Sequence, residues 1–134
     1  MGEKRNQERN ILINIGKAIQ FWRKLEGYDQ NSLSMALKTA RSYVSRLESG
    51  HSGISLSRVE KIAYLLGVSP YTLLRGMPEK EEKEALLELY EDPDYKITKA
   101  ELEDLFSARL KGKIMTRDFY VNMLSIIRSG IYTR

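Results

Sequence analysis

The stretch YDQNSLSMALKTARSYVSRLESG, residues 28–50, decides the fold of this chain. Asp29 can cap a helix that runs to about Leu37, and the next helix spans roughly residues 40–49 before Gly50 ends it. A connection of only two or three residues makes two such helices cross at a steep angle. They then share one partly buried seam, which consists of Leu33, Leu37, Val44 and Leu47.

Outward from this stretch, the first part of the chain continues as helix. Residues 11–25 place apolar side chains three and four positions apart, which predicts one helix that ends at Gly27. Ser55 begins another helix that ends at Gly67. Ser69 caps a short one, with Pro70 at the first helical position, where its missing N–H costs nothing.

Three more helices are expected beyond Pro78. They cover residues 79–90, residues 98 to about 112, and the segment that begins after Thr116 and stops at Gly130. Thr98 and Glu101 have the spacing of a capping box. No segment keeps the strict alternation of a half-buried strand. The sequence therefore predicts an all-α fold, with a five-helix domain over residues 1–76 and a three-helix region over residues 77–134.

Charge is distributed unevenly along the chain. Residues 1–76 hold twelve basic against six acidic residues, a net charge of +6, whereas residues 77–134 carry −2. A basic first part suits a polyanionic partner. The absence of cysteine and the single histidine argue against disulfides, cysteine nucleophiles and zinc sites.

Other function classes are disfavoured as well. The N-terminus lacks the apolar stretch of a signal peptide, and no apolar run is long enough to span a membrane, so we expect a cytoplasmic protein. No activated nucleophile, phosphate-binding loop or metal cluster is recognisable, so we expect neither an enzyme nor a cofactor or metal site.

The run Gly27–Gln30, Leu33, Leu37 and Arg41–Gly50 resembles the phage-repressor type of helix-turn-helix domain, the lambda, 434 and Xre-like group. The resemblance continues without a gap through residues 54–56, 61–63, 66–69 and 73–74, and covers about residues 11–76. It implies a transcription regulator that binds double-stranded DNA through the major groove, typically as a dimer on palindromic half-sites.

The resemblance also implies roles for single residues. Gln30 would hydrogen-bond a backbone phosphate and orient the recognition helix. Arg23 of the first helix would pair with Glu48 late in the recognition helix. The remaining contacts would be made by Arg41, Ser42 and Arg46 at base edges, by Tyr43 and Ser45 at the groove wall, and by His51 and Ser52 at backbone phosphates.

Two positions depart from the pattern. Lys38 occupies the turn position that is often glycine, where a left-handed backbone would cost about 1 kcal/mol. Ala40 occupies the cap position of the recognition helix and has no side-chain acceptor. We therefore expect Thr39 to cap that helix, which would then begin one residue earlier.

Several alternatives remain open from the sequence. The helices after Pro78 could form a homodimer interface, which we favour for a repressor, or could add to the core of the first domain. They could also bind a protein or peptide effector. An antitoxin that represses its own operon and an adaptor that has lost DNA binding are the rival functions. Lys4, Arg5 and Arg9 form either an arm that grips DNA or a frayed tail.

Overall fold

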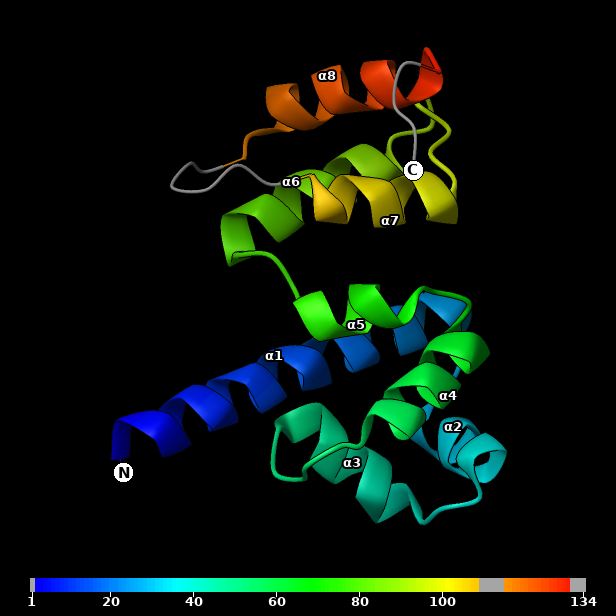
Figure 1. Ribbon diagram of the computed structural model, residues 1–134. Coiled ribbons are helices and arrows are strands. Elements are labelled where there is room, and N and C mark those ends of the chain that lie inside the picture. The colour runs from blue at the N-terminus through cyan, green and yellow to red at the C-terminus, as the bar shows by residue number, and fades with distance from the viewer. Residues whose placement is uncertain (1, 109–114, 131–134) are drawn as a thin grey trace. The chain divides into compact units, whose positions relative to one another are not determined.

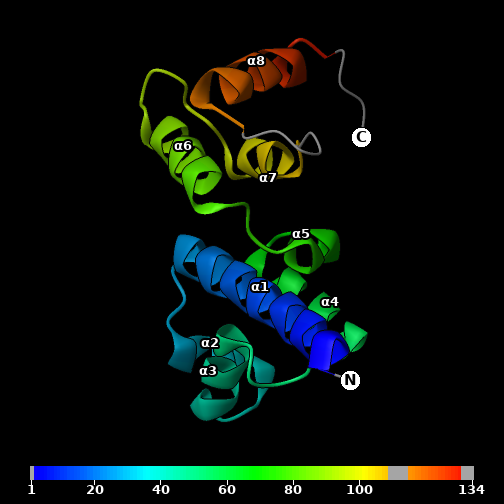
Figure 2. The ribbon, with the colours of Figure 1, turned by 90° about the vertical axis from the view of Figure 1, so that its left-hand side faces the viewer.

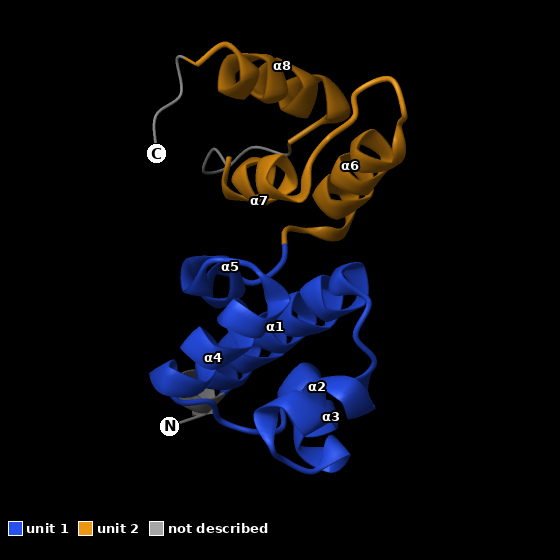
Figure 3. Cartoon of the chain, turned by 90° about the vertical axis from the view of Figure 1, so that its right-hand side faces the viewer, with its two compact units in different colours: residues 1–77 blue, residues 78–134 orange. Residues whose placement is uncertain are grey.

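The computed structural model describes the backbone of residues 2–108 and 115–130, and these ranges contain eight helices and no strand. The all-α prediction is therefore confirmed. None of the described helices combines the length and the hydropathy that a bilayer crossing requires. The chain divides into two compact units, residues 1–77 and residues 78–134 (Figure 3).

The described part of the first unit contains five helices, and their order follows the sequence prediction. Asp29, Ser55 and Ser69 each cap the helix that follows, because each side chain accepts a hydrogen bond from a backbone N–H in the first turn. The helices are α1 (Gly2–Glu26), α2 (Gln30–Leu37), α3 (Arg41–Ser49), α4 (Leu56–Leu66) and α5 (Pro70–Arg75) (Figure 1).

Helix α1 is longer than the sequence predicts. The apolar stripe begins near Ile11, but the helix already begins at Gly2 and runs for 25 residues without a break. Residues 6–11 are exposed, so this N-terminal part contributes little to the core. The prediction of a helix over residues 11–25 is wrong at this end, because the apolar periodicity reports only the buried part of the helix.

Helix α1 is the centre of the first unit. It runs between α5 on one side and α3 on the other (Figures 1 and 2), and it packs most extensively against α3. Trp22 and Ile19 of α1 are fully buried, together with Ile62 and Leu66 of α4. The apolar face that holds α3 and α4 in place therefore belongs largely to α1.

Gly16 sets the distance between α1 and α3. A Cβ atom on this residue would clash with the carbonyl oxygen of Leu47 and would lie 2.6 Å from that of Glu48. Such contacts are too short for any side chain, so the backbones can approach this closely only because residue 16 is glycine. The end of the recognition-helix candidate thus rests directly on the α1 backbone.

The second unit contains α6 (Lys80–Glu91), α7 (Lys99–Ser107) and α8 (Arg117–Arg128). The predicted capping box at Thr98 and Glu101 is present. Arg128 donates to both Glu101 carboxylate oxygens, at 2.8 and 3.1 Å, and to the carbonyl oxygen of Tyr95 at 2.6 Å. These bonds fasten the end of α8 to the start of α7.

The prediction for α7 is wrong at its C-terminal end. The helix ends at Ser107 with Ala108 as its C-cap, not near Gly112, which lies outside the described residues together with Leu110. No glycine or proline marks the true end, so the sequence pattern gave no stop signal at that point.

Candidate nucleic-acid interface

The outer face of α3 is polar and exposed. Of the residues that the sequence singled out, Arg41, Ser42, Ser45 and Arg46 all lie on it with exposed side chains. The inner face of the same helix carries Val44, Leu47 and Glu48, which are buried. The helix therefore presents four hydrogen-bonding side chains to the solvent while its other side is fixed in the core.

Tyr43 differs from the other predicted contacts because it is half-buried. The guanidinium of Arg58 in α4 lies over its ring, 5.5 Å from the centroid, and also donates to the carbonyl oxygen of Leu37 at 3.4 Å. A cation over an aromatic face is an attractive contact. Arg58 is not among the residues expected from the sequence, because its place on the polar side of α4 gave no sign that it reaches α2 and α3.

A buried ion pair fixes the far end of α3. Arg23 of α1 donates through Nε and Nη2 to the Glu48 carboxylate at 2.6 and 3.0 Å, and through Nη1 to the carbonyl oxygen of Tyr28 at 2.9 Å. Arg23 is 6% and Glu48 8% exposed. The pairing that the resemblance implied is confirmed, and it links α1, the turn after it and α3 in one network.

Gln30 belongs to the same network. Its Nε2 donates to the Glu48 carboxylate at 3.0 Å, so the side chain at the start of α2 is held by the end of α3. An amide nitrogen carries two hydrogens, and this bond uses one of them. Gln30 lies at the start of α2, as expected from the sequence, but its bond to Glu48 was not expected.

A polar hollow of about 550 Å³ opens between the starts of α2 and α3. Asp29 is already engaged there as the helix cap, and the backbone N–H of Ser32 keeps the pKa of its carboxyl below the ordinary value. The hollow brings two of the predicted contacts, Gln30 and Arg41, to one place. Its lining residues are Arg23, Asp29, Gln30, Asn31 and Arg41.

The turn between α2 and α3 contains both positions at which the sequence departs from the helix-turn-helix pattern. Lys38 has the left-handed backbone, with φ 57° and ψ 45°, a conformation that favours glycine. Ala40 is the N-cap residue of α3 and makes no side-chain cap bond, and α3 begins at Arg41. The prediction that Thr39 caps the helix is wrong; its buried hydroxyl has no hydrogen-bond partner among the described residues.

His51 and Ser52 lie in the loop that follows the C-terminal end of α3. A nine-residue helix is about 13 Å long, so the length of α3 separates this loop from the backbone of Arg41. His51 is exposed and hydrogen-bonds Ser49 and Arg9, whereas the Ser52 hydroxyl donates to the carbonyl oxygen of Gly53.

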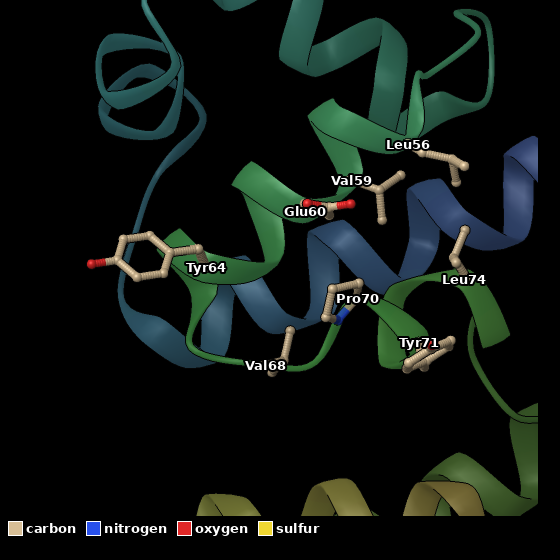
Figure 4. A pocket seen from close by; sticks show the side chains of 8 residues that line it. All are labelled: Leu56, Val59, Glu60, Tyr64, Val68, Pro70, Tyr71 and Leu74. Atoms are coloured by element: carbon tan, nitrogen blue, oxygen red, sulfur yellow. The ribbon is translucent and has the colours of Figure 1, made fainter.

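An apolar groove of about 690 Å³ lies elsewhere on the first unit (Figure 4). It is formed by α4, α5 and the turn between them, and none of the predicted contact residues lines it. Tyr64 and Tyr71 project beside it and are 84% and 69% exposed. The lining residues are Leu56, Val59, Glu60, Tyr64, Val68, Pro70, Tyr71 and Leu74.

Comparison with known proteins gives a family match and one curated relative. A helix-turn-helix family model matches residues 19–73. A competence pilus inhibition repressor of Acinetobacter baylyi is 37% identical over 51 residues, which make up 38% of this chain and 46% of that repressor. The match thus spans about half the length of this relative.

Two solved structures are also similar to the chain. One is the restriction-modification controller protein C.AhdI from Aeromonas hydrophila, with 31% identity and a TM-score of 0.44 over 46% of this chain and 94% of that one. The other is a hypothetical transcription factor, NHTF, from Neisseria, with 31% identity and a TM-score of 0.48 over 57% of this chain and 86% of that one.

Proposed function

Residues 19–73 of this chain belong to the helix-turn-helix family, and from this premise we propose that the protein is a transcription regulator that binds double-stranded DNA in a sequence-specific manner. One observation carries the proposal: four polar side chains are exposed on α3 while its other face is locked to α1. A single α-helix fits the major groove, where each base pair presents a distinct pattern of donors and acceptors.

The chemistry of the exposed face suits this role. Arg41 and Arg46 can each donate two parallel hydrogen bonds to the O6 and N7 atoms of guanine, and Ser42 and Ser45 can donate to or accept from either kind of base edge. Both arginines are exposed, so binding DNA does not require them to break a buried contact.

Polar groups beside α3 suit backbone phosphates. Gln30 can keep Glu48 with one amide hydrogen and donate the other to a phosphate oxygen in the polar hollow, beside Arg41. In the loop after α3, His51 and Ser52 can also donate to phosphate oxygens. Contacts of this kind fix the register of the helix in the groove.

We further propose that the protein is a repressor that acts as a homodimer on palindromic half-sites, with residues 77–134 as the dimerisation or regulatory region. The similarity to a repressor from Acinetobacter baylyi supports repression. A single nine-residue helix offers few base contacts, and a second linked copy raises affinity through effective concentration. Two half-sites would lie about one helical turn apart.

Selection of bound duplexes from random DNA tests both parts of the proposal. We expect the full chain to enrich one palindromic site. Arg41→Ala combined with Arg46→Ala should weaken binding to that site by about 2–6 kcal/mol, since each well-placed bidentate contact contributes about 1–3 kcal/mol. Lys17→Gln combined with Lys24→Gln removes the same charge from exposed positions of α1 and serves as the control.

Two results would contradict the proposal. If the Arg41 and Arg46 double variant bound as tightly as the wild type, α3 would not be the recognition helix. If the full chain sedimented as a monomer at micromolar concentration and enriched only single half-sites, the homodimer would be wrong while DNA binding would stand.

A further inference from the structure

The N-terminal part of α1 lies beside the loop that follows α3 (Figures 1 and 2). Nη2 of Arg9 is 3.2 Å from Nε2 of His51, although the two residues are 42 positions apart in the sequence. Gly50, at the start of the same loop, packs against Ile13 of α1. This part of α1 is therefore helical and contacts the loop that follows α3.

The directions of the hydrogen bonds follow from the donors involved. A guanidinium can only donate, so Nε2 of His51 accepts and the imidazole proton resides on Nδ1. Nδ1 then donates to the Ser49 hydroxyl at 2.8 Å, and that hydroxyl donates to the carbonyl oxygen of Arg46 at 3.1 Å. A chain of three bonds thus joins Arg9 to the end of α3.

Among the residues whose side chains the structure describes, His51 is the one that hydrogen-bonds the Arg9 guanidinium. The group carries five N–H donors, and His51 takes one of them. Arg9 is exposed and lies next to the loop where the backbone phosphates are expected, so the four other donors can serve a phosphate there.

We infer that Arg9 is a further phosphate-binding residue, which extends the DNA interface from α3 onto the N-terminal part of α1. The inference rests on the proposed function. His51 positions the guanidinium. Its planar array of N–H groups then donates hydrogen bonds to a phosphate of the DNA strand that passes the C-terminal end of α3. The contact adds affinity without reading sequence, because every nucleotide offers the same phosphate.

The dependence of binding on salt tests this role directly. The full chain and its Arg9→Gln variant are titrated with the selected duplex at salt concentrations from about 50 to about 400 mM KCl. Loss of one phosphate contact should reduce the slope of log K against log salt by about 0.9. At about 0.1 M salt this corresponds to roughly eightfold weaker binding, with an unchanged sequence preference.

Two variants separate this role from others. Arg9→Lys keeps the charge and should keep the wild-type slope. Lys17→Gln removes one charge from the same helix at a position turned by about 80° from Arg9, and should leave the slope unchanged. The melting temperature of each variant shows whether its fold is intact. Arg9→Gln should have the same melting temperature as the wild type.

The outcomes are distinguishable. If the wild type binds the duplex and Arg9→Gln keeps the same slope, the inference is overturned while the proposed function stands. If Arg9→Gln loses affinity only in proportion to a lower melting temperature, and Arg9→Lys does the same, Arg9 is structural and the inference is again overturned. If the wild type binds no duplex, the proposed function itself fails.

Discussion

Replacing Glu48 by alanine removes the acceptor on which three elements of the first unit converge. The substitution breaks the two bonds from Arg23, at 2.6 and 3.0 Å, and the bond from Gln30 at 3.0 Å. Arg23, which is only 6% exposed in the wild type, then keeps the carbonyl oxygen of Tyr28 as its one acceptor among the described residues. An uncompensated charge in such a place is strongly unfavourable.

The size of the effect follows from this geometry. Removing one partner of a buried ion pair typically costs about 3–5 kcal/mol, whereas a whole domain is stable by only about 5–15 kcal/mol. For a unit of 77 residues, a loss of about 3 kcal/mol lowers the melting temperature by roughly 12–24 °C. Glu48→Ala should therefore bring the first unit close to unfolding.

Trp22 provides a selective signal for this measurement. It is the one tryptophan of the chain, and its side chain is fully buried in the core of the first unit. Urea unfolding of the full chain, followed by tryptophan fluorescence, thus reports the first unit alone. The urea concentration at the midpoint of unfolding should fall for Glu48→Ala. The fluorescence before the transition should remain that of a buried indole.

A double variant provides the control. Arg23→Met combined with Glu48→Leu removes both charges together, and apolar replacement of a whole buried pair is often close to neutral. It should therefore be more stable than Glu48→Ala by at least about 2 kcal/mol. A loss below about 1 kcal/mol for Glu48→Ala, or a double variant that is the less stable of the two, would refute the reasoning.

Three further predictions concern single positions. Gly16→Ala should destabilise the first unit by about 1–3 kcal/mol, seen in the same urea experiment, because the new Cβ forces α3 away from α1; wild-type stability would contradict the close approach. Lys38→Gly should raise stability by up to about 1 kcal/mol, since glycine adopts the left-handed backbone without strain, and a lower urea midpoint would contradict this. In the second unit, the bonds from Arg128 hold the pKa of Glu101 at about 2, below its usual 4.5. This lowered pKa stabilises the folded state above about pH 4.5, and the benefit is lost as the pH falls towards 2. The advantage of the wild type over Glu101→Gln in circular-dichroism melts should therefore shrink over that range, and a constant difference would count against the pair.

Most of the fold could be predicted because its signals are local. A cap such as Ser55 needs only its own side chain and the next turn, and a glycine such as Gly67 needs only its backbone freedom. These signals placed the helix boundaries around the seam and in the second unit to within a residue or two. They failed where no local signal exists, as at the end of α7.

The features that could not be predicted depend on residues far apart in the sequence. Gly16 looks like a weak point in a helix until α3 is seen to rest on it, and Arg9 looks like part of a tail until His51 lies beside it. Thr39 was the better cap by residue type, yet the left-handed turn at Lys38 sets the start of α3 one residue later. Similarly, the cap at Asp29 located Gln30 at the start of α2, but no local signal predicted its bond to Glu48.

The division of α3 into two faces has a consequence for how such a protein can diversify. The positions that hold the helix in the core, Val44, Leu47 and Glu48, are separate from the exposed positions that include Arg41 and Arg46. Exposed substitutions away from special contacts usually change stability by less than about 0.5 kcal/mol. Duplicated copies of this gene could therefore acquire new operators by replacing only the outer residues, and each would inherit a scaffold that already folds.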